Sequence, residues 1–210
     1  MELAALSFLH VLVFVYWLGG DLGAFAASFA LTNDKAAPAA RLAAAKLLGD
    51  LDMAPRTALI LAAPTGLALA EAKGWLALGA PLIAAVWAGS LVWLALAWRI
   101  HLKHGAAPWS RRVDLAIRVA ALVALAAAAA MAPIEGVLRI KLALLAGAIA
   151  CGLFIRYALR SFGPALAPLA AGAPTPQSDA AIADALRIAR PGVIAIWALI
   201  SAAAWLGLSL

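Results

Sequence analysis

The sequence has 210 residues, of which 67% are hydrophobic and only 12% are charged. A soluble domain averages about 25% charged residues, and a chain of this size cannot bury so large an apolar excess in a water-soluble core. The composition therefore predicts an integral membrane protein. The net charge of +6 comes from short basic clusters between apolar runs, so nucleic acid is not an expected partner.

The first apolar run, Leu3–Leu31, predicts a membrane-spanning helix that is retained in the mature protein. No basic residue precedes it, and it is longer than the roughly 7–15 apolar residues of a signal peptide. A helical span needs about 20 mostly apolar residues. Further runs of this kind predict five more spans, at Ala54–Glu71, Trp75–Ile100, Val113–Ala132, Gly136–Leu159 and Ile188–Leu210. The expected fold is thus one all-α transmembrane domain over residues 1–210, a bundle of about six helices.

Two connecting segments carry signals of their own. Pro38–Leu51 mixes leucines with charged residues, which favours a helix lying at the membrane interface rather than crossing the bilayer. Gly163–Ala185 contains four prolines and predicts a loop followed by a short entry helix, with Ser178 or Asp179 as its N-cap.

The basic residues predict the orientation of the bundle. Twelve of them flank the loops after spans one, three and five, whereas only Lys73, Arg139 and Lys141 flank those after spans two and four. Cytoplasmic loops carry the excess of Lys and Arg. Both termini are therefore expected on the non-cytoplasmic side. The natural setting for such a chain is a bacterial inner membrane.

Ionisable residues inside the spans are candidate functional residues, because a charged side chain at the bilayer centre costs about 2.5–3.5 kcal/mol on insertion scales. Asp21 shares the inner half of the predicted bundle with Arg56 and Arg118. A buried charge pair between Asp21 and either arginine, serving helix packing, is the favoured interpretation. A proton path is the alternative.

The three histidines fall into two groups. His10 lies in the outer half of the first span with few polar neighbours, so a structural role and a role as cofactor ligand are both open. His101 and His104 have an i, i+3 spacing that could present both imidazoles to one metal ion. They lie in a basic cytoplasmic loop, which favours a solvated segment. A span separates them from His10, so the three cannot share one ion or one haem.

The first span also carries a recognisable motif. His10 is followed by Trp17 and then Gly20, which resembles the His-x6-Trp-x-x-Gly helix of HemJ-type protoporphyrinogen oxidases and the related CopD-like membrane proteins. The basic segment before Pro55 and the lysine near the start of span five, Arg139-Ile140-Lys141, are similar in order and placement. The resemblance covers about half of the chain, and spans three and four look like an insertion.

This resemblance implies a b-type haem in the bundle, with His10 as the metal ligand. Lys141 would be a nearby cation for a porphyrin propionate or an anionic substrate, and Trp17 and Arg139 would complete the site. The chain departs from the family at residues 150–153, where the family has a second histidine. It also departs at residues 189–192, where the family's last helix begins with Asn-Glu-x-Pro. The resemblance therefore extends further to the fold than to oxidase activity.

Two functions follow from these observations. The first is a haem b-binding membrane redox protein, a haem-dependent oxidoreductase in enzymatic terms, with an outer-half site around His10 and Lys141. The second is a cofactor-free membrane subunit or small-molecule permease whose buried charges serve packing or a pathway. The expected partners are the lipid bilayer and either a membrane redox partner or a second copy of the chain.

Overall fold

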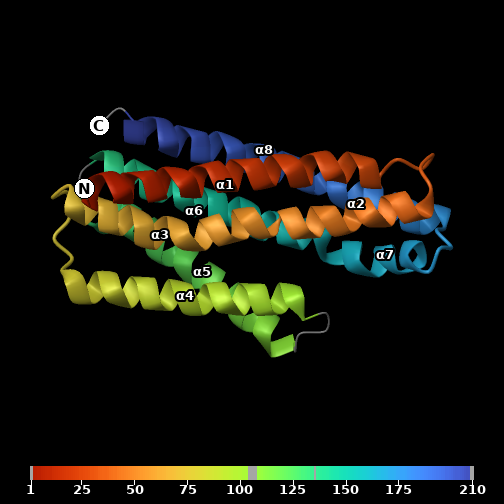
Figure 1. The fold of residues 1–210 in the computed structure, drawn as a ribbon, viewed down its shortest axis with the longest axis horizontal. Coiled ribbons are helices and arrows are strands. Elements are labelled where there is room, and N and C mark those ends of the chain that lie inside the picture. Colours follow the sequence, from red (N-terminus) through yellow and green to blue (C-terminus); the bar gives the residue numbers. More distant parts are fainter. Residues whose placement is uncertain (1, 104–107, 135, 209–210) are drawn as a thin grey trace.

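The computed structural model describes residues 2–103, 108–134 and 136–208. These residues form α-helices and one short 3-10 helix, with no strand among them (Figure 1). The elements are α1 Glu2–Leu31, α2 Pro38–Leu51, α3 Met53–Ala72, α4 Ala80–Leu102, α5 Pro108–Met131, α6 Gly136–Ala158, η1 Leu159–Ser161, α7 Phe162–Ala170 and α8 Pro176–Leu208. The predicted all-α class is confirmed.

Six helical segments are long and apolar enough to cross a membrane, as the sequence predicts. They comprise α1, α3 with α2, α4, α5, α6 with α7, and α8. The start of α1 and the end of α8 lie at the same end of the bundle, as an even number of crossings requires (Figure 1). Which side of the membrane this end faces stays a prediction. The opposite end, where α1 and α4 finish and α5 begins, is called the basic end below.

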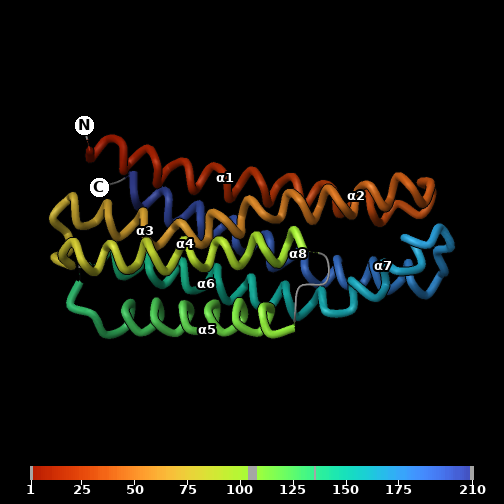
Figure 2. Tube along the Cα trace, turned by 60° about the horizontal axis from the view of Figure 1, so that its bottom comes forward, coloured from red at the N-terminus to blue at the C-terminus, as the bar shows by residue number. Residues whose placement is uncertain are grey.

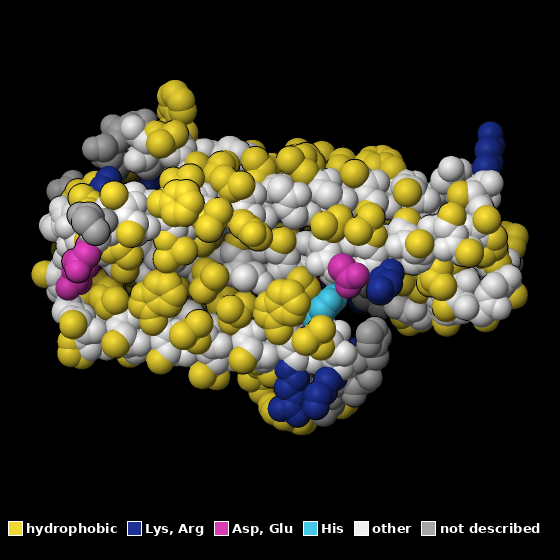
Figure 3. Space-filling model, in the orientation of Figure 1, with side chains coloured by type: hydrophobic (Ala, Val, Ile, Leu, Met, Phe, Trp, Pro, Cys, Tyr) yellow, Lys and Arg dark blue, Asp and Glu magenta, His cyan; other side chains and the backbone are white. Residues whose placement is uncertain are grey.

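The six long helices form a ring. Contacts run in the order α4, α3, α1, α8, α6 and α5, and α5 packs against α4 to close it (Figure 2). Four of them surround a central hydrophobic cluster of Val13, Trp17, Ala58, Ala148, Ile196 and Ile200. On the face that Figure 3 shows, the middle of the bundle is largely apolar, and charged side chains gather toward the two ends and near the start of α5. This is the distribution that a hydrocarbon solvent favours.

Helices α1 and α3 approach each other closely at Gly20. A Cβ atom on Gly20 would lie 2.6 Å from both Ala54 Cβ and Pro55 Cδ, whereas one on Gly19 would meet no atom within 4 Å. Small residues permit such close approach between membrane helices. The glycine of the first-span motif thus has a packing role.

The expected interfacial helix runs along the bundle. Helix α2 lies in line with α3 and packs on α1 (Figure 1). The residue between α2 and α3, Asp52, keeps helical dihedral angles of φ −63° and ψ −14°, so the chain turns little there. Pro38–Leu51 thus continues the direction of α3, and its position relative to the membrane interface stays a prediction.

The expected loop at Gly163–Ala185 is largely helical. Helix α7 and the first turns of α8 pack with α2 around Leu31, Ala44, Leu169, Ile182 and Leu186. This group of α2, α7 and the first half of α8 extends beyond α4 at the basic end (Figure 1) and is called the extension. Burial of these apolar side chains outweighs the loop signals of the prolines.

The start of α8 also differs from the prediction. Thr175 Oγ1 accepts a hydrogen bond from the Ser178 backbone N–H (3.1 Å), and Ser178 Oγ accepts one from the Thr175 N–H (2.9 Å). This reciprocal pair is a capping box, which makes Thr175 the N-cap and places Ser178 in the first turn. Asp179 has another partner.

That partner is Arg41 of α2, which is 3% exposed. Arg41 donates Nη1–H and Nη2–H to the two carboxylate oxygens of Asp179 (3.2 and 2.8 Å), and its Nε–H to the Leu31 carbonyl (3.0 Å). One planar guanidinium therefore joins the end of α1, helix α2 and the start of α8. It satisfies one of the carbonyl groups that every helix end leaves free.

Candidate functional site

A cavity of about 590 Å³ opens at the basic end, and residues of α1 through α6 and of α8 line it. Its titratable lining residues are Asp21, Asp52, Arg56, His101, Lys103, Arg111, Asp114, Arg118, Arg156 and Arg190. Six of these side chains are basic and three are carboxylates. The wall nearer the middle of the bundle includes Trp17, Ala148 and Ile196, which belong to the central hydrophobic cluster. The cavity therefore ends at packed apolar side chains.

Asp114 organises one wall of this basic-end cavity. The carboxylate, whose side chain is 4% exposed, accepts hydrogen bonds from Trp93 Nε1 (3.0 Å), Arg118 Nε (3.1 Å) and Arg156 Nη1 (2.8 Å). The three donors come from α4, α5 and α6. Arg118 also stacks over the Trp93 ring, with its guanidinium carbon 5.6 Å from the ring centroid. One negative charge thus holds two guanidinium groups, and this wall keeps an excess positive charge.

Two further arginines enter from α3 and α8. Arg56 binds Asp52 one turn before it, with Nε 2.6 Å from Oδ2. Arg190 donates Nε–H to Ser28 Oγ and Nη2–H to Ser28 O, both at 3.2 Å, and its guanidinium carbon lies 3.8 Å from the Phe29 ring centroid. Its described contacts thus include no carboxylate, so its charge remains available to the cavity.

Asp21 differs from the other two carboxylates of the cavity. It is 8% exposed, and its Oδ2 has no hydrogen-bond partner among the described residues. In place of the predicted pair of Asp21 with Arg56 or Arg118, the described residues pair Arg56 with Asp52 and Arg118 with Asp114, each aspartate lying four residues before its arginine. Local i, i+4 spacing decides these pairings.

The residues predicted around His10 are divided between different places. Trp17 lines the basic-end cavity, and Arg139 donates to the Ala132 carbonyl just beyond the end of α5 (3.0 Å). Lys141 lies near His10 and against α8, where a Cβ on Gly207 would be 2.6 Å from its Nζ. Of the four predicted site residues, His10 and Lys141 interact electrostatically.

His10 is held by α3. Its Nδ1 lies 2.9 Å from Thr65 Oγ1, and the Thr65 hydroxyl in turn lies 2.6 Å from the Leu61 carbonyl oxygen. A hydroxyl has one hydrogen, and the shorter contact favours its donation to Leu61; in that arrangement the imidazole donates from Nδ1. Nε2 is then the unprotonated nitrogen, which is the arrangement found in metal-ligating histidines.

The ring of His10 is packed against α3 and lies apart from the basic-end cavity. The ring packs against the α3 backbone, since a Cβ on Gly66 would lie 3.1 Å from His10 Cε1. The basic-end cavity does not reach His10. No group of three or more His, Cys, Asp or Glu side chains that could hold a metal ion occurs in the described part of the chain. His10 could serve as a single axial ligand to a haem iron.

The predicted histidine pair lies partly outside the described residues, which exclude His104. His101 is at the mouth of the basic-end cavity, with Nε2 3.3 Å from Asp50 Oδ1 of α2. This contact joins α4 to α2 and gives His101 a structural partner.

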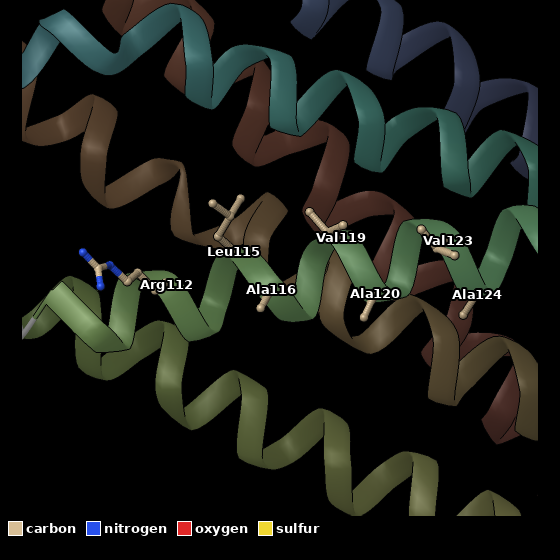
Figure 4. A pocket seen from close by; sticks show the side chains of 7 residues that line it. All are labelled: Arg112, Leu115, Ala116, Val119, Ala120, Val123 and Ala124. Carbon is tan, nitrogen blue, oxygen red and sulfur yellow. The ribbon is translucent and has the colours of Figure 1, made fainter.

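A second hollow, of about 680 Å³, lies along α5 and is lined by α5 residues alone. Figure 4 shows Arg112, Leu115, Ala116, Val119, Ala120, Val123 and Ala124 projecting from this helix. Apart from Arg112 the lining is aliphatic, as expected of a surface that faces hydrocarbon.

Sequence reasoning missed three residues of the cavity. Asp114 was not singled out, although its i, i+4 spacing to Arg118 signals a pair. Arg156 and Arg190 were counted as ordinary cytoplasmic cations, because nothing in their local sequence indicates that they line a shared cavity.

Comparison with known proteins finds no matching protein-family model, no similar curated protein and no similar solved structure.

Proposed function

We propose that the chain is a membrane permease for a small anion, with the basic-end cavity as its binding site. The observation that carries this proposal is the excess of guanidinium groups over carboxylates on the cavity wall, where six basic side chains face three acidic ones. A cavity of one charge sign with low-dielectric walls concentrates the opposite ion. Arginine is also the side chain best suited to bidentate recognition of carboxylate, phosphonate or sulfonate groups.

The shape of the bundle supports a transport role over a purely structural one. The cavity is lined by all six long helices, and Trp17, Ala148 and Ile196 of the central hydrophobic cluster form part of its wall. A packing clamp needs no space of about 590 Å³ between its charges. Transport would require the helices to separate at the central cluster, which is the alternating access expected of secondary transporters.

Anion binding to the purified protein tests this proposal. Trp17 lines the cavity, so its fluorescence is expected to change when an anion enters. We expect saturable binding of at least one of inorganic phosphate, acetate, methylphosphonate and methanesulfonate. Arg190→Gln should weaken it about tenfold, the loss of one charge-assisted contact of about 1.4 kcal/mol. The glutamine can still donate to Ser28, so the fold should remain.

The matched control is Arg187→Gln on the same helix. Arg187 is 73% exposed, pairs with Asp184 and lies outside the cavity, so this variant should bind like the wild type. If none of the four anions binds, or if both variants weaken binding equally, the proposed function is wrong. If an anion does bind, its uptake into proteoliposomes distinguishes a permease from a receptor.

A second candidate function is haem binding at His10, favoured by the tautomer in which Nδ1 donates to Thr65 and Nε2 is unprotonated. Bound haem would supply redox chemistry, His10 would be its axial ligand and Lys141 would offer a cation to a propionate. The test is a visible absorption spectrum of the detergent-purified protein, oxidised and then reduced with dithionite. A Soret band that disappears in His10→Ala supports this candidate, and a colourless wild-type protein after expression with added haem refutes it.

A further inference from the structure

We infer that the ligand of the basic-end cavity is a zwitterion, whose ammonium group is bound by Asp21 and Trp17 and whose anionic group is bound by the arginines of the cavity. This inference rests on the proposed anion-binding function and narrows its substrate class. It stands on the position of one buried carboxylate and on the charges that share the cavity with it.

Asp21 lacks the arginine partner that the other cavity carboxylates have, and its side-chain hydrogen-bond neighbour is Trp17. Asp52 binds Arg56, and Asp114 binds Arg118 and Arg156, whereas Asp21 Oδ2 has no hydrogen-bond partner among the described residues. Burial of a carboxylate without a partner is costly. Oδ2 itself is enclosed by protein, but the Asp21 side chain lines the cavity, so an ammonium group on the ligand can pair with the charge of this carboxylate.

The neighbour of Asp21 on α1 suits a cation. Trp17 lies one helical turn before Asp21, lines the same cavity and is 5% exposed. Trp17, Asp21, Ala24, Phe25 and Ser28 form one continuous face of α1 toward the cavity. A carboxylate beside an indole ring is a favourable site for an ammonium group, because the carboxylate supplies charge and the ring face adds a cation–π contribution.

The other walls of the cavity favour an anionic group. Arg118 of α5 and Arg156 of α6 share the Asp114 carboxylate. Arg190 of α8 binds Ser28 and stacks on the Phe29 ring. A simple anion would satisfy these guanidinium groups and leave Asp21 repelling it. A ligand that carries both an anionic group and an ammonium group satisfies both ends of one cavity.

The inference is tested with two phosphonates of nearly equal size. In 2-aminoethylphosphonate an ammonium group occupies the place of the terminal methyl group of propylphosphonate, and both bear the same anionic head. We expect the wild-type protein near neutral pH to bind 2-aminoethylphosphonate at least about tenfold more tightly, as measured by tryptophan fluorescence and by calorimetry.

Asp21→Asn keeps the shape of the side chain and removes its charge. We expect it to reduce the affinity ratio of the two phosphonates to about one, with propylphosphonate binding unchanged or tighter. The matched control is Asp184→Asn, whose carboxylate is 64% exposed and outside the cavity, and this variant should keep the wild-type ratio. Native-like gel filtration and thermal unfolding of both variants establish that they fold.

Three results overturn the inference. They are equal binding of the two phosphonates by the wild type, a ratio that survives in Asp21→Asn, and failure of both phosphonates to bind. Equal binding would mean that a water molecule or a proton satisfies Asp21, and it would leave the anion-binding function standing. The panel of four simple anions decides that function separately, because its members carry no ammonium group.

Discussion

Single polar side chains connect helices that lie far apart in the sequence. The single carboxylate of Asp114 accepts hydrogen bonds from residues of α4, α5 and α6. Arg41 binds Asp179, a residue 138 positions away. In a medium of low dielectric such contacts are strong when complete and costly when one partner is removed. Packing in this bundle therefore depends on a few charged residues.

Arg41 offers a direct measurement of such a contact. Arg41→Ala should lower the free energy of unfolding by about 3 kcal/mol, because it leaves the Asp179 carboxylate and the Leu31 carbonyl without their donors. Arg41→Lys should recover less than half of this loss, since an ammonium group lacks the planar fork. Denaturant unfolding in detergent provides the measurement.

The control for Arg41 is Lys46→Ala, an exposed position on the same helix, which should change stability by less than about 0.5 kcal/mol. Equal effects of the alanine variants at 41 and 46 would show that Arg41 does not hold the extension in place.

At the scale of elements, the contact between α1 and α3 decides how the first-span motif should be interpreted. Gly20 permits the close approach of the two helices, and the buried Trp17 ring belongs to the central cluster. His10 is held by Thr65 across the same contact. The motif residues that resemble a haem-binding helix thus each have a packing partner on α3 or in the core.

Alanine substitutions at the neighbouring residues Gly19 and Gly20 distinguish the effect of helix propensity on stability from the effect of packing. Gly20→Ala should destabilise the protein by about 1–3 kcal/mol, because the new Cβ overlaps Ala54 and Pro55. Gly19→Ala meets nothing within 4 Å and should stabilise it by about 0.5–1 kcal/mol through helix propensity. Thermal unfolding of both variants gives the signs, and a stabilised Gly20→Ala would contradict the close α1–α3 contact.

For the whole molecule, the length of the helices implies a part outside the bilayer. The segments α2 with α3 and α6 with α7 each have 35 residues, roughly 52 Å of helix against about 30 Å of hydrocarbon. The extension accounts for the surplus at the basic end. If that end faces the cytoplasm, the basic-end cavity opens there as well.

The orientation can be measured with single cysteines in a Cys151→Ser background. Ala77→Cys lies in the connection between α3 and α4, and Ala173→Cys lies between α7 and α8 in the extension, and both positions are exposed. A membrane-impermeant maleimide added to intact cells should label position 77 and leave position 173 unlabelled until the cells are lysed. The reverse pattern would invert the predicted topology.

The sequence by itself determined two properties of this protein: the lipid environment that its apolar surface needs, and its local helical structure. An apolar excess that no small soluble core can bury requires lipid, and lipid requires that each spanning segment satisfy its own backbone hydrogen bonds as a helix. Six spans follow from run lengths alone. The helix boundaries do not follow from run lengths, because a helix need not stop where the hydrocarbon ends. Helix α8, for example, begins at Pro176 rather than near Ile188.

Only the tertiary structure decided which charges meet. The order of helices around the ring brings Arg190 to Ser28 across 162 positions and Arg156 to Asp114 across 42. No local pattern encodes that order, because it depends on how the apolar faces of all six helices pack at once. The basic-end cavity and the unpartnered oxygen of Asp21 exist for the same reason, and they could not be predicted from spacing along the chain.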